Sequence, residues 1–89
     1  MIAKHIIFTG YVQGVGFRFT TIRIANHHDL TGFVRNLPDG NVEMLVQGQL
    51  EDIDNCIKDL QDSFASYIRE TQIEDVPPNP KYSGFNITF

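Results

Sequence analysis

Gly10-Tyr11-Val12-Gln13-Gly14-Val15-Gly16-Phe17-Arg18 is a glycine-rich segment between strand-like and helix-like sequence. Its three glycines require a loop at this point of the chain. The apolar run Ile6-Ile7-Phe8 before it predicts a strand over residues 4–10. The spacing of apolar residues after Gly16 predicts a helix from Phe17 to about His28. The chain is therefore expected to open with a strand, a glycine loop and a helix.

The middle of the chain predicts a β-hairpin followed by a second, amphipathic helix. Residues 30–37 roughly alternate between apolar and polar, Pro38-Asp39-Gly40 supplies a tight turn, and residues 42–46 return, so we expect a hairpin over 31–47. Apolar residues then recur every three or four positions, as a buried helix face requires: Leu50, Ile53, Ile57, Leu60 and Phe64. The corresponding buried candidates of the first helix are Phe17, Ile22 and Ala25.

The C-terminal third predicts two further strands. Residues 67–74 are typical of an outer strand, 76–80 hold three prolines and form an irregular connection, and 84–89 alternate again and close the sheet. The element order βαββαβ plus a terminal strand favours an α+β fold, a ferredoxin-like split βαβ sandwich with an antiparallel-dominated sheet and both helices on one face. We expect residues 1–89 to form a single domain.

Composition and charge limit the classes of function. With 42% hydrophobic and 20% charged residues the chain is not disordered, and no apolar run is long enough to span a membrane. The single Cys56 cannot form an internal disulfide, which favours a reducing cytoplasm. The net charge of -4 hides an asymmetry, because residues 1–37 carry +3 and residues 38–89 carry -7. A small anionic ligand fits this distribution better than nucleic acid does.

The glycine loop has the properties of an anion-binding cradle. No good capping side chain stands between Gly14 and Arg18, so the first amides of the helix lack an evident internal acceptor. Arg18 can add a bidentate contact to two phosphate oxygens. A P-loop needs Lys-Ser/Thr after its last glycine, and a dinucleotide-binding loop needs a glycine where Phe19 stands, so neither matches. A tight turn without a ligand remains the structural alternative.

Two motifs resemble those of the acylphosphatase family. Residues 10–18 look like its signature G-x-V-Q-G-V-x-[FY]-R, and Gly32-Phe33-Val34-Arg35-Asn36 resembles its second motif, G-x-V-x-N. The match is close from about residue 4 to 65, and only the general pattern agrees after Tyr67. The resemblance implies hydrolysis of the carboxyl–phosphate bond of small acyl phosphates, without metal or cofactor.

The resemblance also assigns roles to residues of this chain. Arg18 and Asn36 are the implied catalytic residues, with Asn36 orienting the attacking water. The resemblance implies that Arg18 and the loop amides of residues 11–17 hold the phosphoryl group. The implied substrate-binding residues are Gln13, Gly14, Val15, Gly16 and Phe17. We expect the side chains of Arg18 and Asn36 to face one cavity. The expected partners are a small acyl phosphate and its product phosphate, with no nucleic acid and no membrane, and the chain is expected to be a monomer.

Other functions remain as alternatives. RNA-binding RRM domains share the element order, but residues 41–46 lack the aromatic and basic residues of their third strand. A non-catalytic phosphate-binding module, or an accessory domain of a carbamoyl-transfer maturation factor, would carry the same motifs. His27-His28-Asp29 is expected to be a polar helix end rather than a metal site. We expect His5 to be exposed, Arg35 to be a solvated charge, and Cys56 not to be a nucleophile.

Overall fold

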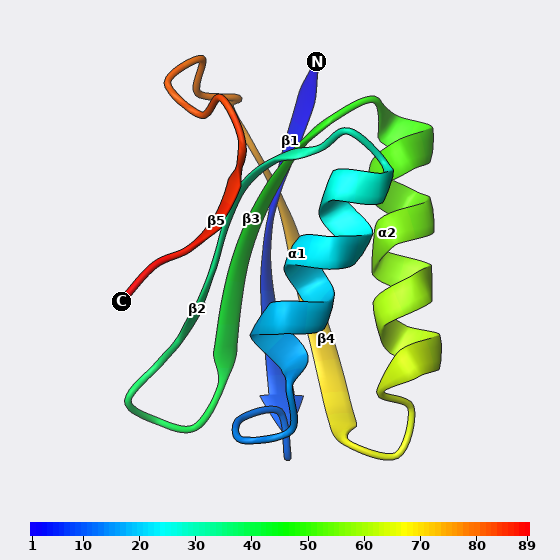
Figure 1. Ribbon diagram of the computed structural model, residues 1–89, viewed down its shortest axis with the longest axis vertical. Helices are drawn as coiled ribbons and strands as arrows, with labels where there is room; N and C mark the ends of the chain where they lie inside the picture. Colours follow the sequence, from blue (N-terminus) through cyan, green and yellow to red (C-terminus); the bar gives the residue numbers. More distant parts are fainter.

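Five strands form one mixed sheet in the order β4-β1-β3-β2-β5, and two helices cover one of its faces (Figure 1). The computed structural model describes residues 1–89. The elements in chain order are β1 (Ile2–Gly10), α1 (Phe17–His27), β2 (Thr31–Asn36), β3 (Val42–Gly48), α2 (Leu50–Ser63), β4 (Ile68–Val76) and β5 (Phe85–Ile87). The predicted ferredoxin-like α+β fold is confirmed.

The sheet differs from the prediction at its edges. β1 begins two residues earlier than predicted, and β4 begins one residue later and ends two residues later than predicted. β5 is the expected short C-terminal strand; it spans residues 85–87 of the predicted 84–89 and completes the sheet by pairing in parallel with β2. The segment between β4 and β5 crosses one end of the sheet and is held by Gln47, whose side chain makes two hydrogen bonds with the Asn79 backbone, of 2.7 and 2.9 Å.

The core lies between the sheet and the helices. Alternation along β1 and β3 turns Ile6, Phe8 and Met44 inward, where they are fully buried. From α2 the core receives Ile53, Cys56, Ile57 and Leu60. Leu50 was expected in this stripe but is 45% exposed, because it is the first residue of α2 and lies beyond the edge of the core.

The buried face of α1 is also partly different from the prediction. Phe17 and Ala25 are buried as expected, but Thr21 takes the central place and Ile22 is only partly buried at the margin of the core. Thr21 tolerates full burial because its hydroxyl donates a 2.8 Å hydrogen bond to the carbonyl of Phe17. Neither helix is long and apolar enough to cross a membrane.

A bulge at the end of β1 directs the chain into the glycine loop. The register with β4 shifts between Thr9 and Gly10, and the amide of Tyr11 donates to the carbonyl of Tyr67 at 2.8 Å. Gly10 has φ of +116°, and a Cβ there would lie 2.2 Å from the Tyr67 carbonyl oxygen. Only glycine fits this close approach, so the turn into the loop depends on Gly10.

Candidate active site

The sheet topology brings the glycine loop and Asn36 to the same end of the molecule. β1 and β2 both pair antiparallel with β3, so they run in the same direction and end at the same edge. Val42 of β3 pairs with Phe8 on one side and with Asn36 on the other, which places Asn36 level with the end of β1. In Figure 1 the loop after β1 and the β2–β3 turn lie together at the lower end.

A cavity of about 280 Å³ lies between this loop, the start of α1 and the end of β2. Arg18 and Asn36 both line it, as the sequence predicted. The remaining lining residues are Val12, Gly14, Gly16, Phe17, Phe19 and Ile87. None of these residues is acidic, so the only formal charge on the cavity wall is that of Arg18.

The start of α1 leaves a series of backbone donors without protein acceptors. Gly16 caps the helix in the left-handed conformation, with φ 79° and ψ 18°, and no side chain caps the helix. No backbone hydrogen bond is donated by the amides of residues 12–19. Left-handed glycines followed by a helix N-terminus form a concave set of N–H groups that suits a phosphate-sized anion. The free amides that the sequence predicted at the start of the helix are therefore present.

Arg18 is half-buried and makes no ion pair with the protein. Its guanidinium carbon lies 5.8 Å from the ring centroid of Phe89, a cation–π distance. The aromatic ring does not neutralise the charge, and the N–H groups of the guanidinium remain free for a bidentate contact with an anion.

Asn36 lines the cavity from the end of β2 and carries an unsatisfied carboxamide oxygen. Its Oδ1 atom is buried and has no hydrogen-bond partner. A buried acceptor without a partner costs free energy. The terminal torsion of asparagine is soft, and a rotation about it can offer either the oxygen or the NH2 group to the cavity. The site thus combines donors for an anion with an amide that can bind water.

Two of the predicted binding residues do not line the cavity. Val15 is partly buried and packs against the core. The side chain of Gln13 turns to the β2–β3 hairpin, where Nε2 donates 2.8 Å hydrogen bonds to the carbonyls of Leu37 and Asn41. For both residues, only the backbone amide is available to the cradle.

Sequence reasoning missed the apolar part of the site. Phe19, 75% exposed, stands at the cavity wall on α1, and Ile87 reaches the same wall from β5. Phe89 adds an exposed ring beside Arg18. Phe19 has a sequence signal, since it is a large apolar residue off the buried face of its helix. Ile87 and Phe89 have none, because their proximity depends on β5 pairing with β2.

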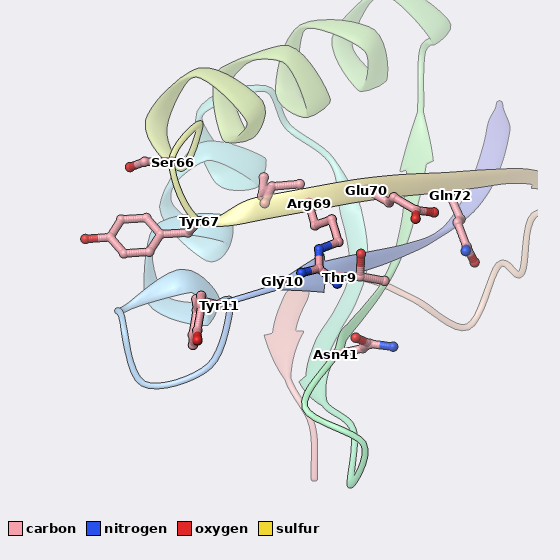
Figure 2. A pocket seen from close by; sticks show the side chains of 10 residues that line it. Thr9, Gly10, Tyr11, Asn41, Ser66, Tyr67, Arg69, Glu70 and Gln72 are labelled. Atoms are coloured by element: carbon pink, nitrogen blue, oxygen red, sulfur yellow. The ribbon is translucent and has the colours of Figure 1, made fainter.

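A larger cavity of about 660 Å³ lies on the other side of the loop, over the β1–β4 bulge. Figure 2 shows Arg69 reaching from β4 toward Thr9 and Gly10, with Glu70 on the same strand. Tyr11 and Asn41 also line this cavity. It contains both signs of charge and neither Arg18 nor Asn36, so it is a poorer candidate for binding a phosphoryl group.

Several polar residues outside the cavity have structural partners. His5 and Arg35 were expected to be solvent-exposed, but both are half-buried and bind the Glu43 carboxylate. Desolvation would raise the pKa of Glu43, but hydrogen bonds from His5 and Arg35 and the charge of Arg35 outweigh it and hold the pKa below its usual value. His28 pairs with Asp59 at 3.2 Å, and no cluster of three or more His, Cys, Asp or Glu residues is placed to hold a metal ion.

Cys56 has the environment of a packing residue. It is fully buried in the core face of α2. Burial, with a smaller contribution from the charge of Asp59, raises the pKa of its thiol to about 12. A thiolate is therefore not formed at neutral pH, which agrees with the expectation that Cys56 is not a nucleophile.

Sequence comparison and structure comparison with known proteins both find acylphosphatases. A family model described as Acylphosphatase matches residues 4–87. A protein named Acylphosphatase from Bacillus licheniformis is 37% identical over 90 residues, spanning 100% of both chains. The crystal structure of acylphosphatase from Bacillus subtilis superposes with a TM-score of 0.92, at 29% identity over 100% of both chains. This chain also aligns, with a TM-score of 0.86 and 37% identity, to 12% of HypF from T. kodakarensis, with 100% of its own length covered.

Proposed function

This chain belongs to the acylphosphatase family of hydrolases, as its two motifs predicted, and we propose that it cleaves acyl phosphates at the cavity shared by Arg18 and Asn36. The family implies an acyl phosphate as substrate and phosphate as product. One observation supports this location of the reaction. A single small cavity brings together an unpaired arginine, free backbone amides and an unsatisfied carboxamide.

The phosphoryl group is held by Arg18 and by the amides of residues 13–17. The amide of Tyr11, which was expected among them, is instead bound to the Tyr67 carbonyl. Phosphoryl transfer proceeds through a loose transition state, in which negative charge develops on the equatorial and leaving oxygens. Donors that are already oriented toward those oxygens stabilise this charge without reorganising during the reaction. The glycines at 14 and 16 allow the backbone to approach the phosphate closely.

Asn36 orients the attacking water. Rotation about the terminal torsion brings the carboxamide oxygen, which is buried in the structure, into the cavity. There it accepts a hydrogen bond from water and directs the water oxygen toward phosphorus, opposite the leaving carboxylate. The new P–O bond forms to water, the bond between phosphorus and the acyl oxygen breaks, and the carboxylate leaves with the electron pair of that bond. Because an amide is a poor base, a phosphate oxygen takes the proton of the water.

The chemistry of the leaving group explains why the site needs few residues. A carboxylate is a stable anion at neutral pH, so it leaves without protonation by a general acid. Positioning and charge stabilisation then supply most of the catalysis. No step in this scheme calls for a Lewis acid or a redox group, and we propose that the reaction proceeds without metal or cofactor.

The test is hydrolysis of benzoyl phosphate in the presence of EDTA. We expect turnover by the wild type, and a loss of about 10²- to 10³-fold in kcat/KM for Arg18→Ala and for Asn36→Ala. Arg23→Ala and Asn86→Ala are matched controls, since both residues are exposed and lie outside the cavity, and they should retain activity. Activity that depends on added metal, or that survives both cavity substitutions, would contradict the proposal.

A second candidate function is a non-catalytic phosphate-binding module. The alignment to 12% of T. kodakarensis HypF supports it, because there the same fold is one part of a larger protein. This alternative predicts inorganic phosphate binding that Arg18→Ala abolishes, with no hydrolysis by the wild type. The same benzoyl phosphate assay therefore separates the two functions.

We also propose that the protein acts as a cytoplasmic monomer without a nucleic-acid partner. The single cysteine is buried, so it requires no oxidising compartment. The acidic net charge of residues 38–89 opposes binding of a long polyanion. Size-exclusion chromatography with light scattering tests the monomer, since a dimer would double the mass of 10.1 kDa.

A further inference from the structure

The side chain of Gln13 joins the anion loop to the strand end that carries Asn36. Its Nε2 atom lies 2.8 Å from the carbonyl oxygen of Leu37 and 2.8 Å from that of Asn41. Leu37 follows Asn36 directly in the chain, and its own amide donates to the Asn41 carbonyl at 2.9 Å. Gln13 therefore binds both sides of the β2–β3 turn, at the residue after Asn36 and at the residue before β3.

We propose that Gln13 is a positioning residue, which sets the distance between the phosphate cradle and Asn36 by bridging the loop to the hairpin. The inference rests on the proposed function, because it assumes that the cradle holds the phosphoryl group and that Asn36 orients the water. Gln13 acts through its side chain on Asn36, while its backbone amide belongs to the cradle.

No other hydrogen bond connects the loop to the hairpin. The amide of Tyr11 ties the loop to β4, and the carbonyl of Gly16 accepts from Thr20 of α1. Val12 and Val15 contribute apolar contacts with the core, which are not directional. Without Gln13 the cradle keeps its link to β4 and α1 but loses its only directional link to the strand of Asn36.

The chemistry of the contact requires an amide at position 13. Both acceptors are carbonyl oxygens, and a single NH2 group supplies the two hydrogens that they need. Glutamate has the same shape but supplies no hydrogen when ionised, so Gln13→Glu places a negative oxygen against two carbonyls. Gln13→Ala removes the bridge without adding repulsion.

The experiment is a double-mutant cycle between positions 13 and 36, measured with benzoyl phosphate. A misplacement of about 1 Å can cost about 100-fold in rate, so we expect Gln13→Ala to lower kcat by at least about tenfold, and Gln13→Glu by more. Inhibition by inorganic phosphate should change far less than kcat, because the cradle itself persists. In the Asn36→Ala background, Gln13→Ala should lower the remaining kcat by less than about twofold.

Gln47→Ala is the matched control. Gln47 also makes two hydrogen bonds to backbone, but at the crossing of the β4–β5 segment and outside the cavity. We expect it to lower the thermal midpoint, and any effect on kcat should be the same in the wild-type and Asn36→Ala backgrounds.

The outcomes separate the two proposals. If Asn36→Ala has wild-type activity, the proposed function is wrong, and the positioning role of Gln13 is then wrong as well. If Asn36→Ala is impaired but the effects of Gln13→Ala and Asn36→Ala multiply, only the bridge is wrong. A parallel loss of phosphate binding and kcat in Gln13→Ala would show instead that Gln13 maintains the cradle, which also overturns the bridge.

Discussion

Arg18 and Asn36 line the same cavity although they belong to different elements, the first turn of α1 and the last residue of β2. The arginine faces the cavity as a free cation, and the carboxamide carries a buried oxygen without a partner. The buried oxygen costs free energy while it has no partner, and the arginine and the carboxamide together suit a bound anion and water. This combination leads to distinct predictions for stability and for activity.

Asn36→Val should separate folding from catalysis. It removes an unsatisfied buried acceptor from a strand end and introduces a residue with good β-propensity. We expect the free energy of unfolding in urea to stay unchanged or to rise by up to about 1 kcal/mol, while hydrolysis is lost. A destabilisation of more than about 1 kcal/mol would indicate that Asn36 has a structural role.

Arg18→Lys should show that charge alone is insufficient. Lysine keeps the positive charge but lacks the planar fork that contacts two phosphate oxygens. We expect kcat/KM to fall by about 10²-fold and inhibition by phosphate to weaken, with the thermal midpoint nearly unchanged because Arg18 makes no ion pair. Full activity of Arg18→Lys would mean that the guanidinium geometry is not used.

Alanine substitution should destabilise the fold more at Gly10, at the start of the loop, than at Gly16, at its end. Gly16 has φ of +79° and open space where a Cβ would stand, so Gly16→Ala adds only the left-handed strain, about 1–2 kcal/mol, and Gly16→Asn adds less. Gly10→Ala forces a Cβ to 2.2 Å from the Tyr67 carbonyl oxygen and should cost more than Gly16→Ala. Chemical denaturation of the three variants tests this order, and equal costs would contradict the bulge geometry.

Glu43→Gln should change the acid stability of the fold. Because hydrogen bonds from His5 and Arg35 lower the pKa of Glu43 in the folded state, its ionised form stabilises the protein above the unfolded pKa of about 4, and this stabilisation is lost as the pH falls through the folded pKa. We expect Glu43→Gln to lose about 1 kcal/mol at neutral pH.

The difference between wild type and Glu43→Gln in urea denaturation should shrink as the pH is lowered below about 4. Activity at neutral pH should be retained, since Glu43 does not line the cavity. A difference that is constant from neutral to acid pH would show that the charge of Glu43 is not what stabilises the fold.

Local sequence patterns predicted most of the elements, because they depend on neighbours close in the chain. The three glycines required the loop, the uncapped start near Arg18 indicated free amides, and Pro38-Asp39-Gly40 indicated the hairpin. The predicted buried residues were wrong where tertiary packing outweighed the local pattern of apolar residues. Thr21 lies on the buried face of α1 in place of Ile22. The burial is tolerated because its hydroxyl finds an acceptor one turn back, which a scale of hydrophobicity does not register.

The sequence by itself determined the chemical inventory of this protein: a glycine cradle, one arginine at its edge and an asparagine in a second motif. Only the tertiary structure decided how these groups meet. The shared neighbour β3 aligns the ends of β1 and β2, the hydrogen bonds of Gln13 span 24 and 28 positions, and Ile87 arrives through the pairing of β5 with β2. Such contacts depend on strand register, which is set by burial across the whole sheet and not by the residues adjacent in sequence.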